Sequence, residues 1–262
     1  MSICVKLWLL TLLLPLGSKA ATAPVLSINL TLQDRQFLIA NNQTISIVLP
    51  SPASDSNANV TVALTLRPIA NLTRIAFDAA PVLYLAYAPI GSFDTIQMTL
   101  QIPATYGQAY SFDGAGINGD GTGVDGAISI YYSAPQADAA PLIVGVAGYV
   151  YDVAAGKPAQ PSPLNYYGLN RYETRLIPQT APVAWVFVST NLNVGSVLPI
   201  ALLKPVPPLT AAPHGGRSQT GQVVPTLQIG RYLPVQLDGD AQATIYFNIS
   251  GNAFAYAANP TN

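Results

Sequence analysis

The sequence predicts an all-β protein: an antiparallel β-sandwich of ten or more strands, with little or no helix in the mature chain. Segments in which apolar and polar residues alternate recur along the chain, as in strands that bury one face. The 23 prolines and 20 glycines punctuate the chain between these segments. Strong helix formers are scarce, and Glu173 is the sole glutamate. These observations favour a sandwich or a barrel.

The first half of the chain contains most of the alternating segments. At residues 21–32 we expect a strand with Leu26 and Ile28 facing the core and the polar residues between them facing outward. We interpret residues 71–80 as the one segment able to form a helical turn, which Pro81 would end. Further strands are expected at residues 44–49, 60–66, 82–88, 95–102 and 106–112.

The second half continues the pattern, with one segment of a different kind. Residues 142–151 are apolar on both faces and are interrupted by Gly145 and Gly148, which is typical of a central strand with close backbone packing. The alternative is a strand whose outer face meets another molecule. Residues 154–163 resemble a linker; we expect a single domain over residues 21–262, and the alternative is two sandwiches divided there. Further strands are expected at residues 127–132, 183–187, 223–237 and 243–256.

Residues 1–20 have the features of a signal peptide. They combine a positively charged start, an apolar run too short to span a bilayer, and the small residues Ser18 and Ala20 at the cleavage positions. We therefore expect a secreted protein, extracellular or at the cell surface, or periplasmic in a bacterium, with no transmembrane segment in the mature chain. The alternative is a retained anchor. Cleavage would remove the only cysteine, Cys4, which excludes thiol catalysis, thiolate zinc sites and disulfides.

Charged residues make up only 9% of the chain, against about 25% in typical soluble proteins. The formal net charge is −1, and the loss of two lysines, Lys6 and Lys19, with the signal peptide would leave about −3. Because the chain has no basic patch, we expect no nucleic-acid partner. Uncharged polar residues supply most of the polarity, which suits an extracellular surface or packing against copies of the same protein.

The largest cluster of oxygen ligands is a loop expected at residues 113–126, which is rich in glycine and aspartate. Asn118-Gly119-Asp120-Gly121-Thr122 resembles the middle of the calcium loops of EF-hands and dockerin-type repeats. The segment departs from those loops at Gly116, where the first acidic ligand would stand, and it lacks a following glutamate and flanking helices. The alternative is a hairpin connection whose glycines supply positive φ angles. The resemblance implies that calcium would be bound by Asp113, Asn118, Asp120, Thr122 and Asp125.

The candidate ligand-binding residues are aromatic. Tyr166, Tyr167 and Tyr172, with Arg171, fall in one segment that we expect to be a loop. A tyrosine ring can stack on a sugar or on a partner surface while its hydroxyl forms hydrogen bonds. The alternative is that these tyrosines lie at the rim of the core.

The sequence offers few groups for bond-breaking chemistry, and we assign no catalytic residue. Nucleophilic catalysis needs a base, and His214 is the only histidine. A pair of carboxylates would allow glycoside hydrolysis. Nothing in the spacing singles out a pair among Asp113, Asp120, Asp125, Asp152 and Glu173.

The function favoured by these features is that of a secreted, non-catalytic extracellular protein: an adhesin or a fibre-forming structural subunit of the cell surface. Copies would associate through edge strands, and residues 21–32 are the natural candidate for strand exchange. The first alternative is a carbohydrate-binding module, calcium-dependent if the central loop binds the ion, with a surface glycan as its partner. The second is an aspartate-based glycoside hydrolase.

Five glycosylation sequons are present, at Asn29, Asn42, Asn59, Asn71 and Asn248.

Overall fold

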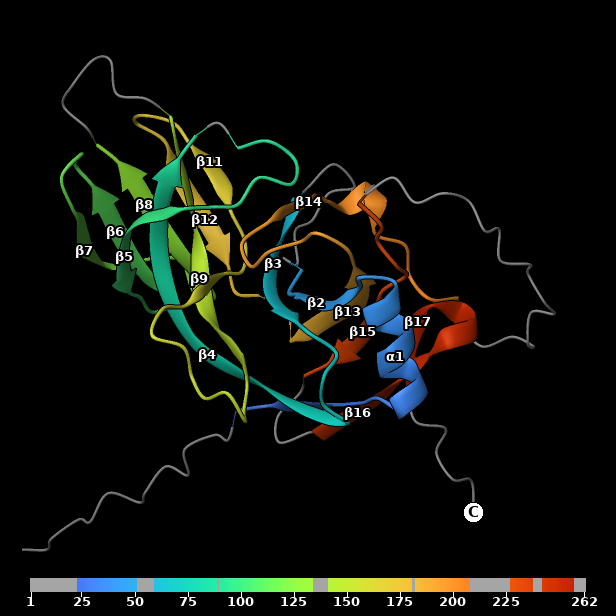
Figure 1. The fold of residues 1–262 in the computed structure, drawn as a ribbon. Helices are drawn as coiled ribbons and strands as arrows, with labels where there is room; N and C mark the ends of the chain where they lie inside the picture. The colour runs from blue at the N-terminus through green and yellow to red at the C-terminus, as the bar shows by residue number, and fades with distance from the viewer. Residues whose placement is uncertain are drawn as a thin grey trace, which may run out of the picture.

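The structure of the protein is a computed structural model. Within the described residues the chain forms seventeen strands in three sheets, one α-helix and two short 3-10 helices (Figure 1). The all-β class predicted from the sequence is confirmed. None of the helices in this part of the chain is long and apolar enough to cross a membrane. The described residues are 23–50, 59–88, 90–133, 141–180, 182–207, 227–237 and 242–256; the predicted signal peptide and His214 lie outside them.

The largest sheet has eight strands. They are β1 (Val25–Asn29), β4 (Leu72–Tyr87), β5 (Met98–Pro103), β9 (Leu142–Asp152), β10 (Ser162–Pro163), β11 (Tyr167–Leu169), β16 (Gln242–Asn248) and β17 (Ala253–Tyr256). Their hydrogen-bonded order is β10-β9-β4-β1-β16-β17, with β5 paired to β4 and β11 paired to β9. The two longest strands, β4 and β9, pair antiparallel and form the middle of the sheet.

Two smaller sheets complete the fold. The first has the order β14 (Val197–Pro199), β3 (Asn59–Leu66), β2 (Thr44–Val48), β13 (Val183–Ser189) and β15 (Leu233–Gln236). The second has the order β12 (Thr174–Pro178), β8 (Ala127–Tyr132), β6 (Gln108–Phe112) and β7 (Ile117–Thr122). The helices are α1 (Leu32–Ala40), η1 (Ile200–Leu202) and η2 (Ile249–Gly251).

Both smaller sheets pack on one face of β9, each through its own apolar core. Val150 joins the core that the five-stranded sheet and α1 close, whereas Val144 and Val146 join the core of the four-stranded sheet. Alternate residues of a strand point to the same side, so these three valines share one face of β9. In Figure 1 the two smaller sheets accordingly lie side by side along the curved course of β4.

The prediction of a central strand covered on both faces is confirmed by β9, in which residues 142–148 are all buried. Its glycines mark close packing, as expected. A Cβ atom at Gly145 would stand 2.1 Å from the carbonyl oxygen of Asn165, and one at Gly148 would stand 2.8 Å from Cδ1 of Leu164. No larger residue fits at these two positions without a shift of the neighbouring chain.

The helical turn predicted at residues 71–80 is wrong, because this segment is the first half of β4. Thr73, Ile75 and Phe77 are buried at alternate positions, and Arg74 between the first two is exposed, which is the spacing of a strand. The pairing register places Leu26 of β1 opposite Ile75. Pairing with this remote strand outweighs the local capping signals. Pro81 lies at an irregularity within β4 rather than beyond its end.

The only α-helix of the described residues is α1, which begins at Leu32, the last residue of the strand expected at residues 21–32, and continues into a segment to which we assigned no element. Thr31 and Asp34 form a capping box at its start. The Thr31 hydroxyl accepts a hydrogen bond from the backbone N–H of Asp34 at 3.1 Å, and the Asp34 carboxylate accepts one from the N–H of Thr31 at 2.7 Å. Leu38 is fully buried in the core under the helix. The short helix agrees with the prediction of little helix.

Candidate functional site

The prediction of one continuous loop over residues 113–126 is wrong, because β7 lies within it and pairs with β6. The turn before β7 is held by Asp113. Its Oδ1 accepts hydrogen bonds from the backbone N–H groups of Ala115 at 2.8 Å and Gly116 at 3.0 Å. The Gly116 N–H, and after it that of Ala115, holds the pKa of the Asp113 carboxyl below its usual value.

The structure does not gather the expected calcium ligands into a cluster of carboxylates. Asp120 lies where the register between β6 and β7 shifts, and its Oδ1 accepts a hydrogen bond from the Ser111 hydroxyl at 3.0 Å. Asn118 and Thr122 are exposed on either side of this shift, and Asp125 is exposed in the turn before β8. Within the described residues, no three side chains of His, Cys, Asp or Glu could hold one metal ion. The calcium hypothesis depends on the sequence resemblance alone.

The predicted tyrosine group divides into two parts. Tyr166 is half-buried, and its hydroxyl accepts a hydrogen bond from the Asn59 side chain at 2.7 Å. Tyr167 packs against the core of the four-stranded sheet. Arg171 and Tyr172 lie together on the surface, with the guanidinium 4.3 Å from the ring centre. The first two tyrosines therefore contribute to packing, and only the Arg171–Tyr172 pair is presented for contact.

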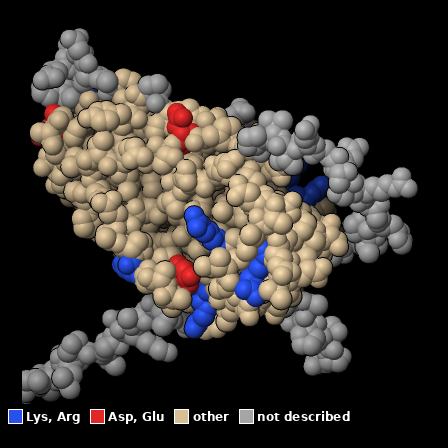
Figure 2. Space-filling view, viewed as in Figure 1, with Lys and Arg blue, Asp and Glu red and all other residues tan. Residues whose placement is uncertain are grey.

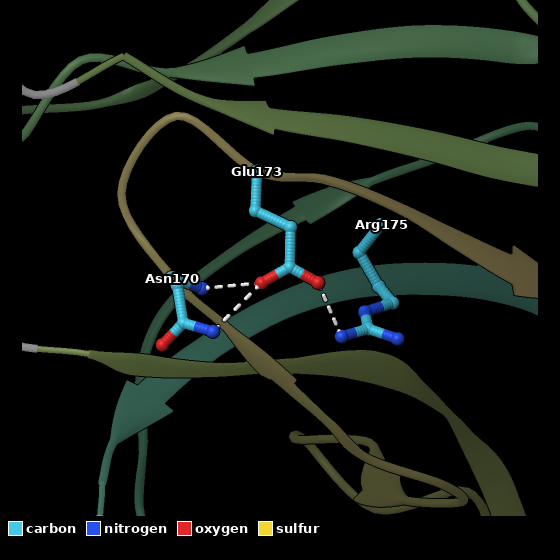
Figure 3. A network of polar contacts seen from close by, with 3 residues as sticks. All are labelled: Asn170, Glu173 and Arg175. Atoms are coloured by element: carbon cyan, nitrogen blue, oxygen red, sulfur yellow. Dashed lines mark hydrogen bonds and ion pairs between the residues drawn. The ribbon is translucent and has the colours of Figure 1, made fainter.

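The turn that carries this pair is braced by Glu173 (Figure 3). One carboxylate oxygen accepts hydrogen bonds from the backbone N–H and the side-chain amide of Asn170, at 2.9 and 3.0 Å. The other oxygen accepts a hydrogen bond from Arg175. Both oxygens of the sole glutamate thus have a structural role in holding the turn between β11 and β12.

Asp152, another carboxylate considered for glycoside hydrolysis, also has a local partner. Its Oδ1 accepts a hydrogen bond from the backbone N–H of Ala154 at 3.0 Å, in the turn after β9. Aspartates in this arrangement stabilise turns, because a short side chain can bond to the backbone two residues later. The hydrogen bonds recorded for Asp113, Asp120, Asp152 and Glu173 all join these carboxylates to groups of the same turn or hairpin.

A pocket of about 220 Å³ opens where the three sheets meet, and the sequence did not reveal it. Its floor is the large sheet, through Phe77 and Val150. One wall is the end of the five-stranded sheet, through Leu49 and Leu237, and the other is formed by Tyr106 and its neighbours beside the four-stranded sheet. The pocket therefore exists only because two separate sheets end side by side on a third.

An irregularity of β4 shapes one side of this pocket. The pairing of β4 with β9 jumps from Asp78–Tyr149 to Val82–Ala147, so that β4 has two more residues than β9 between these pairs. Pro81 has no N–H group to give to the strand ladder, which suits such a break.

Charged and aromatic side chains meet on the opposite face of β9. Tyr149 and Tyr151 are two residues apart and half-exposed, so they share a side of the strand. Lys157 lies with its Nζ 3.9 Å from the centre of the Tyr149 ring and 2.6 Å from Oδ2 of Asp78. The hydrogen bond from Lys157 holds the pKa of the Asp78 carboxyl below its usual value.

Comparisons with models of protein families, with curated proteins and with solved structures find no match for this chain. The functional proposals rest on the geometry of the chain itself.

Proposed function

We propose that the protein is a secreted, non-catalytic extracellular protein, an adhesive or fibre-forming structural subunit of the cell surface that associates with copies of itself. The proposal includes cleavage of a signal peptide at residues 1–20 and one β-sandwich unit over residues 21–262. The observation that carries it is the position of β1. This first described strand lies in the interior of the large sheet, between β4 and β16.

The distribution of charge supports a non-catalytic role. Figure 2 shows a face on which charged side chains are few and scattered among uncharged ones. The carboxylates of Asp113, Asp120, Asp152 and Glu173 each accept hydrogen bonds that hold a turn or a hairpin. These hydrogen bonds give each of the four carboxylates a role in local structure, which supports the proposal of a non-catalytic protein.

Removal of β1 would open a groove along the large sheet. Leu26 and Ile28 are both 0% exposed, and burial of such side chains contributes about 1.5–3 kcal/mol each. On either side β1 pairs over five residues, antiparallel with β4 and parallel with β16. Without it, both neighbours would present unpaired backbone groups beside an apolar trough, a surface that an identical strand fills.

The connection of β1 to the rest of the fold allows exchange between copies. Only Leu30 and Thr31 separate β1 from α1. The β1 of a second copy would make the same contacts in the groove, so exchange costs little beyond association. If each copy donates its β1 to the next, the interface is head-to-tail and builds a filament or a ring.

Cysteine cross-linking tests this proposal directly. Ser27 of β1 pairs with Thr244 of β16, and both are half-buried. Neighbouring strands lie about 4.8 Å apart, within the range that a disulfide spans. The variants Ser27→Cys and Thr244→Cys are co-expressed as mature chains and oxidised. We expect a disulfide-linked heterodimer on a non-reducing gel, because β1 of one chain would lie beside β16 of the other.

Two controls make the result decisive. The double variant Ser27→Cys/Thr244→Cys should form the disulfide, which shows that the pair is close enough. Ser27→Cys co-expressed with Thr174→Cys, an exposed position on β12, should give only background cross-linking. An efficient internal disulfide in a monomeric double variant, with no heterodimer from the mixed single variants, would show that β1 stays in its own chain.

Carbohydrate binding is the second candidate, and the tyrosine pair on the outer face of β9 favours it. Tyr149 and Tyr151 present aromatic rings beside the ion pair of Lys157 and Asp78, and sugars are commonly bound by aromatic stacking combined with polar hydrogen bonds. We expect Tyr151→Ala to abolish binding on a glycan array, while Tyr172→Ala leaves it intact. Repeating the array with a chelator tests calcium dependence. Equal binding by wild type and Tyr151→Ala would place the sugar elsewhere.

A further inference from the structure

We propose that the pocket at the junction of the three sheets binds a small, uncharged, largely apolar molecule of about ten carbon atoms. The proposal is independent of the self-association of β1. The pocket measures about 220 Å³ and is lined by residues of all three sheets or of the segments that adjoin them.

The volume sets the size of the ligand. A cavity of about 150 Å³ lined by leucine, isoleucine and phenylalanine stays dry and binds benzene. At about 220 Å³, the present pocket has room for roughly half as much again. A two-ring aromatic or a branched hydrocarbon skeleton of about ten carbons matches this volume.

The lining sets the chemical class. The hydrocarbon of the lining comes from five buried side chains, those of Leu49, Phe77, Val150, Leu164 and Leu237. An apolar molecule gains free energy when it leaves water for such a surface. A sugar or an ion of the same size would lose its hydration without finding partners for its polar groups.

One side of the pocket carries a polar anchor. The hydroxyl of Tyr106 forms a hydrogen bond with Thr180, and burial raises the pKa of Tyr106. Both residues line the pocket. The pair can donate and accept hydrogen bonds, so a ligand with one hydroxyl or carbonyl group would be oriented with that group toward Tyr106.

Among the described residues that line the pocket, Asp78 is the only charged one, and Nζ of Lys157 lies 2.6 Å from its Oδ2. A cationic ligand would have to displace Lys157 from this carboxylate, and no described residue of the lining offers an anionic ligand a positively charged partner. The rim contains the exposed residues Ala80, Gln179 and Pro182, which indicates where a ligand can enter. The charges of the lining therefore favour a neutral molecule, and the exposed rim gives it a way in.

The test uses 2-naphthol as the probe, a two-ring aromatic with one hydroxyl group that is uncharged at pH 7. Binding of the probe to the mature protein is followed by the fluorescence of 2-naphthol and by the rise in the Tm of the protein. We expect saturable one-site binding with a Kd in the micromolar range. Val146→Phe, which fills the interior, and Ala80→Trp, which covers the rim, should each weaken binding more than about tenfold.

Matched controls separate pocket binding from adsorption elsewhere. Ala154→Trp adds the same side chain at an exposed position outside the pocket and should bind the probe as the wild type does. Decahydro-2-naphthol should displace the probe, whereas glucose should not. No saturable binding by the wild type, or binding that both Val146→Phe and Ala80→Trp retain, would overturn the proposal. Should Val146→Phe fail to fold, Ala80→Trp still decides the outcome.

Discussion

At the scale of single residues, Gly145 shows how one missing side chain permits a close approach of two segments. The backbone carbonyl of Asn165 and the hydroxyl of Tyr84 occupy the space that a Cβ atom would fill, at 2.1 and 2.7 Å from it. Tyr84 is fully buried and donates a hydrogen bond to the same carbonyl at 2.7 Å. A methyl group here would have to displace backbone rather than the end of a flexible chain.

We therefore expect Gly145→Ala to lower the free energy of unfolding by about 1–3 kcal/mol, the usual cost of overpacking a core. Urea denaturation of the mature chain measures it. Gly168→Ala is the matched control, because Gly168 is in the neighbouring strand β11 and nothing lies within 4 Å of its added Cβ. Equal stability of the two variants would contradict the packing described here.

The ion pair between Asp78 and Lys157 predicts a dependence of stability on pH. The hydrogen bond from Lys157 lowers the pKa of Asp78 in the folded protein below the ordinary value of 3.8. The carboxylate therefore stabilises the fold above that value, and this contribution is lost as the pH falls through the lowered pKa. Asp78→Asn should reduce the urea midpoint at pH 7 and match the wild type near pH 2. A difference that persists at pH 2 would assign the loss to packing instead.

At the scale of elements, neither α1 nor the first half of β4 was predicted correctly from the sequence. Thr31 and Asp34 form a capping box at the start of α1, whereas we expected a strand as far as residue 32. Residues 71–80 carry equally good capping residues, yet they form a strand because β1 and β9 pair with them. Local signals decide an element only when no remote partner competes for its backbone.

The capping box gives a prediction for this element. Thr31→Ala removes the hydroxyl that accepts from the Asp34 N–H at 3.1 Å, and such losses cost about 1 kcal/mol. Thr31→Ser keeps the hydroxyl and should restore most of the stability. The free energy of unfolding from urea titrations of the three proteins tests this. A Ser variant as unstable as the Ala variant would mean that the methyl group of Thr31, not its hydroxyl, matters.

At the scale of the whole molecule, two cores share one pair of strands. Val150 and Val146 of β9 belong to different cores, only four residues apart. If the two halves unfolded separately, β4 and β9 would have to come apart over part of their length while the rest stayed paired. The shared strands therefore couple the two cores, and we expect the mature chain to unfold in one cooperative transition.

Trp185 makes this coupling measurable. It is the only tryptophan after the predicted signal peptide, and it stacks on Tyr232 with ring centres 4.3 Å apart, in the half that contains the five-stranded sheet. Its fluorescence reports that half, whereas far-UV circular dichroism reports all strands. The two urea curves should coincide. Separate midpoints would support the alternative of two sandwiches divided near residues 154–163.

The chain alone was sufficient for the all-β class, the buried character of β9 and the positions of most strands, because alternation and turn residues are local properties of neighbouring amino acids. It was not sufficient to show that β1 lies between β4 and β16, that Tyr166 and Tyr172 separate, or that a pocket forms beside Phe77. Each of these depends on which distant segments become neighbours. That choice is made by packing three sheets against one another at once, and no short stretch of sequence contains it.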